Sequence, residues 1–250
     1  MRPALDERRT YAPRSRQERF IVPLIAAAVE RAIGDHAVYG GRALDVGCGG
    51  QPFRALLETS GMAYAAMDTQ AQPGRPVDAL AAIDGRLPSD IGWERAFDLI
   101  ICTEVLEHVA DWPAAWANLA CLLRPGGRLI VTCPFVYPLH EQPFDFFRPT
   151  SHALRAHAER AGLEVLALER LGSAGEAIAT LLAASSPVPR RPGPTAALAA
   201  AALRPLCKLA FRIAQRVARS RLIELRGEVY LANFAVLGKP ANPPKDPLAP

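Results

Sequence analysis

The stretch from Ala43 to Gln51 constrains the fold most, because a short apolar run there ends in closely spaced glycines: Ala-Leu-Asp-Val-Gly-Cys-Gly-Gly-Gln. A helix-like segment, Phe-Arg-Ala-Leu-Leu-Glu, follows at residues 53–58. This order predicts a strand, a tight turn and the start of a helix. Glycines let the backbone approach a ligand closely, and the helix N-terminus offers unpaired N–H groups to a polar or anionic group. Alone, the pattern also fits an ordinary connection between a strand and a helix.

Further helix and strand signals extend this start into a domain. Apolar runs and helical periodicity predict helices at 16–33, 112–123, 151–161 and 196–225, and strands at 43–46, 62–67, 77–83, 97–102, 128–133, 164–169 and 228–237. Strands alternating with helices predict an α/β fold, a Rossmann-like doubly wound, mostly parallel seven-stranded sheet with helices on both faces. Ligands bind such a sheet at the carboxyl ends of its strands.

Composition divides the 250 residues into a core and less regular segments. We expect a flexible basic arm at 1–15, a core formed by 16–183 and 228–238, a proline-rich loop with a basic amphipathic helix at 184–227, and a disordered tail at 239–250. The apolar run at 20–29 fits a helix packed before the first strand better than a signal peptide. No Cys-x-x-Cys spacing occurs among the five cysteines, so we expect reduced thiols, no metal site and a cytoplasmic location.

Polar residues follow three of the expected strands. Asp68 ends the second strand 19 residues after Gly49, where a carboxylate can accept hydrogen bonds from ribose hydroxyls, although a helix cap or surface turn is the simpler alternative. Asp84 follows the third strand and could accept from an adenine amino group or belong to an ordinary Asp-Gly turn. Thr103 and Glu104 directly follow the fourth strand. All four side chains are therefore expected at the ligand edge.

In order and at matching intervals, these motifs resemble those of class I S-adenosylmethionine-dependent methyltransferases. The motifs are Asp45-Val-Gly-Cys-Gly, Asp68, Asp84, Phe97-Asp-Leu-Ile, Glu104-Val-Leu-Glu-His and Leu123-Arg-Pro-Gly-Gly. The resemblance covers roughly residues 40–170 and the closing strand. It departs from the family in the turn, where a further glycine is often found but Gln51 and Pro52 stand here.

The resemblance implies an S-adenosylmethionine site with three parts. The glycine turn would wrap the methionine moiety, which Asp45 would help to orient and which Thr103 and Glu104 would line. Asp68 would hold the ribose, and Asp84, with the glycine after it, the adenine. The expected cofactor residues are therefore Asp45, Gly47, Cys48, Gly49, Asp68, Asp84, Gly85, Thr103 and Glu104.

A second informative stretch, residues 134–150, leaves the fifth strand at the same edge and is too polar for a core and too aromatic for a solvated loop. A lid or substrate wall fits better. It resembles the His-Glu-x-Pro-x-Asp-aromatic-x-Arg segment of methyltransferases often associated with cell-surface polysaccharide assembly.

The candidate catalytic residues lie in this stretch. His140 is the best candidate base for a hydroxyl acceptor, because the unperturbed pKa of histidine lies near neutrality. Asp145 or Glu141 could orient His140 or bind sugar hydroxyls, and Arg148 could hold an acidic sugar or a phosphate. Alternatively, Arg148 pairs with Asp145 or Glu141 and holds the loop in shape. For His108, a structural role at a helix start is as plausible as a role in the site.

From residue 190 to residue 226, nine basic residues accompany one acidic residue. The simplest interpretation is a helix packed on the domain by its apolar face, with a solvated basic face. The alternative is peripheral contact of residues 204–221 with an anionic membrane. No nucleic-acid-binding module is recognisable, so no nucleic-acid partner is expected. The sequence leaves the oligomeric state undetermined.

The sequence thus favours methyl transfer from S-adenosylmethionine to a small molecule or glycan, most simply to a hydroxyl oxygen. Two alternatives remain at this point: a lipid or quinone-like acceptor, and a cofactor-binding partner without catalytic activity in a biosynthetic complex.

Overall fold

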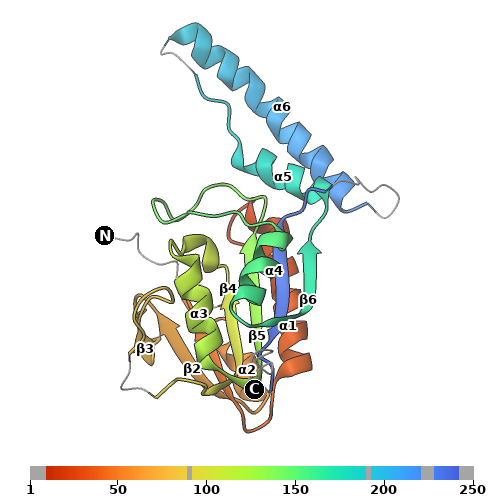
Figure 1. Cartoon of the computed structure of the whole chain (residues 1–250). Coiled ribbons are helices and arrows are strands. Elements are labelled where there is room, and N and C mark those ends of the chain that lie inside the picture. Colours follow the sequence, from red (N-terminus) through yellow and green to blue (C-terminus); the bar gives the residue numbers. More distant parts are fainter. Residues whose placement is uncertain (1–9, 89–91, 190–192, 221–227, 242–250) are drawn as a thin grey trace.

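A single twisted sheet of seven strands forms the centre of the computed structural model, which describes residues 10–88, 92–189, 193–220 and 228–241 (Figure 1). The strands lie in the order β3-β2-β1-β4-β5-β7-β6. Only β7 runs antiparallel to its neighbours, which are β5 and β6. The predicted Rossmann-like, mostly parallel sheet is therefore confirmed. The strands are β1 (Arg42–Val46), β2 (Ala63–Asp68), β3 (Ala79–Leu80), β4 (Phe97–Thr103), β5 (Leu123–Pro134), β6 (Glu164–Leu171) and β7 (Ala232–Gly238).

Helices cover both faces of the sheet because the central strands bury side chains on both sides. In β4, Ile100 and Cys102 pack toward one core and Leu99 and Ile101 toward the other. The first core lies under α3 and α4, and the second under α1 and α2, which also receives part of α5 and α6. The helices are α1 (Glu18–His36), α2 (Arg54–Thr59), the short 3-10 helix η1 (Leu106–His108), α3 (Trp112–Leu122), α4 (Ser151–Arg160), α5 (Ala174–Ala184) and α6 (Pro194–Ala218).

Several elements differ from the sequence-based expectation. The third strand, expected at 77–83, shrinks to two residues because the Asp78 side chain and backbone take over the bonds to β2 at this edge. Helix α5 was not predicted, although Ser173 and Glu176 form a capping box that is visible in the sequence. Helix α6 ends at Ala218 and β7 begins only at residue 232, while residues 221–225 of the expected helix lie outside the described residues.

The two ends of the chain lie partly outside the described residues. Of the expected basic arm, only residues 10–15 are described, and the ring of Tyr11 packs 5.1 Å from that of Phe53. Of the expected tail, only residues 239–241 are described, and Lys239 donates hydrogen bonds to the carbonyls of Ala120 and Leu123.

Helices α5 and α6 form a hairpin that extends away from the sheet, beyond the carboxyl end of β6 (Figure 1). Only Ala200 and Phe211 of α6 are buried. The expectation that α6 packs on the domain by its main apolar face is wrong, because the side chains on that face are at least 50% exposed: Leu198, Leu203, Leu206, Leu209 and Ile213. Within the described part of the chain, no helix is both long and apolar enough to cross a bilayer.

Candidate active site

The glycine turn after β1 forms the centre of the candidate cofactor site. Gly47 (φ +65°) and Gly49 (φ +46°) both have left-handed backbone conformations that favour glycine. A Cβ on Gly47 would lie 2.3 Å from Cγ2 of Val105, so a side chain at residue 47 would collide with the loop after β4. The turn is anchored to the next strand, because the Gly47 N–H donates to the Met67 carbonyl over 2.8 Å.

Gln51, which departs from the family pattern, is accommodated by its own hydrogen bonds. Its backbone is also left-handed (φ +56°), a conformation that costs a non-glycine residue roughly 1–2 kcal/mol. The side chain is 2% exposed, and its Nε2 donates to the Pro76 carbonyl over 2.8 Å, while its Oε1 accepts from Arg54 over 3.2 Å. These two hydrogen bonds stabilise the left-handed backbone at residue 51, where the family often has a glycine.

Two carboxylates at strand ends face this turn. Asp68 ends β2, and its Oδ2 accepts a 2.9 Å hydrogen bond from the Gly49 N–H. Asp84 lies in the turn after β3, where the side-chain amide of Asn118 donates to the carbonyls of Ile83 and Gly85. Asp68 and Asp84 both line the same cavity, Asp68 from the end of β2 and Asp84 from the turn after β3.

Asp45 is the most electrostatically perturbed acid of the site. It is 2% exposed, and its Oδ2 accepts a 2.9 Å hydrogen bond from the Tyr64 hydroxyl. Burial raises its pKa from 3.8 to about 7, the Tyr64 hydrogen bond opposes this shift, and the charge of Asp68 adds to it. Asp45 can therefore take up a negative charge when a cationic group arrives.

All these groups surround one cavity of about 750 Å³ at the carboxyl ends of the strands. This volume fits a cofactor-sized ligand. The cavity is lined by most of the expected residues, namely Asp45, Gly47, Cys48, Gly49, Asp68, Asp84, Thr103, Glu104, His140 and Glu141. Gly85, Asp145 and Arg148 lie behind this surface rather than in it. Sequence reasoning missed the contribution of the N-terminal segment, because no motif marks Tyr11, Ser15 and Gln17, which also line the cavity.

The loop of residues 135–149, which follows β5, is braced from inside by an ion pair. The Arg148 guanidinium donates to both oxygens of Asp145, over 2.5 and 2.7 Å, and also to the carbonyls of Tyr137 and Pro138. This is the internal pairing that the sequence left as the alternative to ligand binding by Arg148. Burial tends to raise the pKa of Asp145, but the bonds from Arg148 and the His140 N–H outweigh it and hold this pKa below its usual value.

Asp145 in turn positions the imidazole of His140. Nδ1 of His140 lies 3.3 Å from Asp145 Oδ2 and 3.3 Å from the Pro138 carbonyl. Arg148 Nη2 also lies 3.4 Å from Nδ1 of His140, but its two N–H groups have shorter bonds, over 2.7 Å to Asp145 and 3.1 Å to the Pro138 carbonyl. We therefore assign a proton to Nδ1 of His140, between two acceptors. Its other nitrogen, Nε2, therefore presents a lone pair. Burial and the neighbouring His108 lower the pKa of His140, so the ring is neutral at pH 7.

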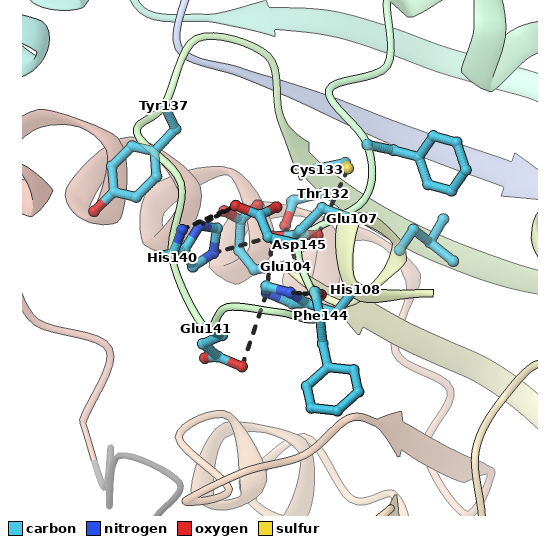
Figure 2. A network of polar contacts seen from close by, with 12 residues as sticks. Glu104, Glu107, His108, Thr132, Cys133, Tyr137, His140, Glu141, Phe144 and Asp145 are labelled. Carbon is cyan, nitrogen blue, oxygen red and sulfur yellow. Dashed lines mark hydrogen bonds and ion pairs between the residues drawn. The ribbon is translucent and has the colours of Figure 1, made fainter. Parts of the chain in front are cut away.

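Glu107, which sequence reasoning did not single out, and His108, for which it left a role in the site open, complete this cluster (Figure 2). Nδ1 of His108 donates to the Phe144 carbonyl over 2.8 Å, so its Nε2 also presents a lone pair. The Glu107 side chain is fully buried, and its Oε1 lies 3.8 Å from Nε2 of each histidine. The signal that could have found them is their position in the segment 104–108, directly after β4.

Both ends of the 135–149 loop are fixed by the last strand and the residues that lead into it. The N–H groups of Phe135 and Val136 donate to the Leu231 carbonyl over 2.7 and 3.1 Å. At the other end, the buried side chain of Asn233 donates to the Pro149 carbonyl over 2.9 Å. The loop is thus held from residues about a hundred positions further along the chain.

This strand order, together with a glycine turn and acids at three successive strand ends, defines the class I S-adenosylmethionine-dependent methyltransferases. The donor set fits the cofactor, since separate acids are available for its ammonium, ribose and adenine groups. The chain belongs to the methyltransferase domain family, whose sequence profile matches residues 14–168, more than half of the chain.

Individual relatives match more narrowly. A ubiquinone biosynthesis O-methyltransferase from Xanthomonas axonopodis pv. citri is 34% identical over 102 residues, which are 37% of this chain and 43% of that protein. The chain therefore spans less than half the length of this relative. Among solved structures, an S-adenosylmethionine-dependent methyltransferase from Archaeoglobus fulgidus has a TM-score of 0.54 at 12% identity, covering 89% of this chain and 97% of that one.

A further structure contains bound S-adenosylhomocysteine. This is the 1,6-didemethyltoxoflavin-N1-methyltransferase of Burkholderia thailandensis, with a TM-score of 0.51 at 15% identity, covering 87% of this chain and 78% of that one. At these identities, the likeness to solved structures concerns the fold alone.

Proposed function

We propose that the chain methylates an oxygen acceptor, a hydroxyl group of a small molecule or glycan. The observation that carries this proposal is the Asp145–His140 pair, which directs a neutral imidazole Nε2 into the wall of the cofactor cavity. When bound, S-adenosylmethionine supplies an electrophilic methyl group. A hydroxyl acceptor must lose its proton to attack that group, which is a task for a base at this position.

The residues divide this work among them. Arg148 keeps Asp145 ionised, and Asp145 holds the Nδ1 proton of His140, so that Nε2 is oriented toward the acceptor. Nε2 of His140 then accepts the hydroxyl proton. Phe144 and Phe146 line the cavity on the same side, where they exclude water from the reacting groups.

The test is a methyl-transfer screen with labelled cofactor, starting from activated sugars and glycolipids and including catechol-like hydroxyls. With an accepted substrate, His140→Ala should lower kcat by about 100-fold or more while cofactor affinity changes little. His152→Ala is the matched control, because His152 is an exposed histidine of α4 outside the cavity. Unchanged turnover of His140→Ala would remove this residue from the reaction, and transfer only to nitrogen or carbon acceptors would contradict the oxygen assignment.

A second candidate acceptor is a lipid or quinone-like molecule that the enzyme meets at an anionic membrane surface. The exposed apolar face of α6 supports it, because this face would otherwise contact water, and α6 contains no acidic residue. Arg204, Lys208, Arg212 and Arg216 form a stripe beside this face, as expected of a helix lying on anionic lipid. The name of the Xanthomonas relative, a ubiquinone biosynthesis enzyme, agrees with such an acceptor.

Flotation with vesicles tests the membrane contact. The chain should float with phosphatidylglycerol vesicles and not with phosphatidylcholine vesicles, and salt should release it. The triple variant Leu206→Asn/Leu209→Asn/Ile213→Asn should lose flotation, whereas Leu80→Asn should keep it, because Leu80 is an exposed leucine at the opposite edge of the sheet. A chain that stays in the soluble fraction with both vesicle types would refute the contact. Self-association through α6 would instead appear as a larger mass in light scattering.

A further inference from the structure

Three electron-pair donors converge on one point beside the cofactor cavity. Nε2 of His108 and Nε2 of His140 each lie 3.8 Å from Oε1 of Glu107, and the three atoms lie within 4.8 Å of one another. The two rings meet at 4.7 Å between their centroids, edge to face (Figure 2). The donors come from two separate segments, η1 after β4 and the loop after β5.

The other contacts of the two histidines leave the Nε2 lone pair of each ring facing Oε1 of Glu107. Each histidine carries its proton on Nδ1, because Nδ1 of His108 faces the Phe144 carbonyl and Nδ1 of His140 faces Asp145 and the Pro138 carbonyl. The other oxygen of Glu107, Oε2, accepts from the Cys133 thiol. Oε1 is fully buried and has no hydrogen-bond partner among the described residues. A separation of 3.8 Å is too long for a hydrogen bond, so two lone pairs and a carboxylate oxygen face one another.

We propose that Glu107, His108 and His140 bind a divalent transition-metal cation. Two imidazole nitrogens and one carboxylate oxygen suit Zn²⁺, Co²⁺, Mn²⁺ or Fe²⁺ better than Mg²⁺ or Ca²⁺. Ligand atoms around such an ion lie about 3.0–3.4 Å apart, so modest side-chain movements close the site. The contacts on the Nδ1 side are those that orient metal-binding histidines, a backbone carbonyl for His108 and a carboxylate for His140. This proposal replaces the sequence-based expectation that the chain has no metal site.

The inference rests on the proposed function and gives it a different base. With a cation in place, Nε2 of His140 is a ligand, and the acceptor hydroxyl binds the cation at a position open to the cavity. The hydroxyl proton then passes to the Glu141 carboxylate, whose Oε2 lies 3.9 Å from Nε2 of His108, and from there to water. The oxygen forms its bond to the methyl carbon, and the broken sulfur–carbon bond returns its electron pair to sulfur. The cation acts as a Lewis acid that lowers the pKa of the hydroxyl.

Cobalt is the probe for the site, because Co²⁺ in a site with nitrogen ligands absorbs visible light. The full chain, stripped with a chelator, should take up one Co²⁺ with absorption bands of a low-coordinate site, and Zn²⁺ should displace it. His108→Ala and His140→Ala should each weaken Co²⁺ binding by more than about 100-fold, and Asp145→Asn by about 10-fold or more. His152→Ala should bind Co²⁺ like the wild type. Binding of S-adenosylhomocysteine by each variant shows that the fold and the cofactor cavity are intact.

The outcomes separate this inference from the proposed function. If wild-type protein that binds S-adenosylhomocysteine takes up no Co²⁺, Zn²⁺ or Mn²⁺, or binds them equally well after both histidine substitutions, the cation site is refuted. Methyl transfer to a hydroxyl that persists in chelator would then leave His140 as the base. If the cation binds as expected but no oxygen acceptor is ever methylated, the site stands and the proposed function fails.

Discussion

The buried carboxyl group of Asp45 should make the stability of the cofactor-free protein fall as the pH rises. Its pKa is raised from 3.8 to about 7 in the folded protein, mainly by burial. Between these two values the folded protein holds a proton that the unfolded chain has released, so the free energy of unfolding decreases with pH. Each unit corresponds to about 1.4 kcal/mol, which gives a loss of about 4 kcal/mol that is complete above pH 7.

Replacing Asp45 with Asn removes this ionisation and keeps an oxygen to accept the hydrogen bond from Tyr64. At about pH 4 the variant and the wild type should be equally stable, because both are then neutral at residue 45. At about pH 8 the variant should be more stable by up to about 4 kcal/mol, a difference of about 8–16 °C in melting temperature for a chain of this size. Urea unfolding followed by tryptophan fluorescence at several pH values measures the difference, in which other titrations cancel.

Asp98 is the matched control on the neighbouring strand. It is 5% exposed, like Asp45 nearly buried, but it accepts from the Arg42 N–H over 2.8 Å and forms an ion pair with Arg124. Asp98→Asn should therefore lower the free energy of unfolding at about pH 8 by about 1–3 kcal/mol, the opposite sign. A stability difference between Asp45→Asn and wild type that is the same at every pH would refute the reasoning, because it would mean that burial does not hold the proton on Asp45.

Three further substitutions test other parts of the site. Gly47→Ala should cost about 2–4 kcal/mol in urea unfolding, since its Cβ would lie 2.3 Å from Val105 and its φ is +65°, and adding Val105→Ala should restore part of that loss. Asp68→Ala should weaken S-adenosylmethionine binding in calorimetry by at least about 10-fold, because it removes the acceptor of the Gly49 N–H, and unchanged affinity would exclude Asp68 from the cofactor site. Arg148→Ala should destabilise the protein by about 2–3 kcal/mol while S-adenosylhomocysteine affinity stays within a few-fold, because it leaves Asp145 without its main partner, and an intact melting temperature would contradict that role.

The cofactor side of the site could be predicted from the sequence because its residues follow strands. In a parallel sheet the residue after each strand reaches the same edge, so finding the strands placed Asp68, Asp84 and Thr103 together without any knowledge of side-chain contacts. Gln51 shows the limit of this reasoning. The sequence marks it as a departure from the family, but only the structure shows that bonds to Pro76 and Arg54 hold its left-handed backbone.

The acceptor side could be predicted only in part, because long-range contacts set it. His140 was identified by its chemistry, but the direction of its ring depends on Asp145, and the meeting with Glu107 depends on how the loop folds back over η1. Two backbone bonds from Phe146 and Phe147 to the Glu107 carbonyl fix that fold, and no local pattern announces them. In α6 the helical period revealed an apolar face but not that the face stays uncovered, since a period describes one element and not its neighbours.

The order in which the strands and the loop are translated has a consequence for folding on the ribosome. Strands β1 to β5 and the glycine turn are all translated before the loop that carries His140, whereas Leu231 and Asn233, which fasten the two ends of that loop, emerge about a hundred residues later. The nascent chain can therefore assemble the strands around the glycine turn while the loop of residues 135–149 still lacks the contacts that hold its two ends. Strand β7, which lies between β5 and β6, is the last strand to be translated, so we expect an unfinished chain to form the glycine turn and its neighbouring strands before the loop that carries His140 is fixed.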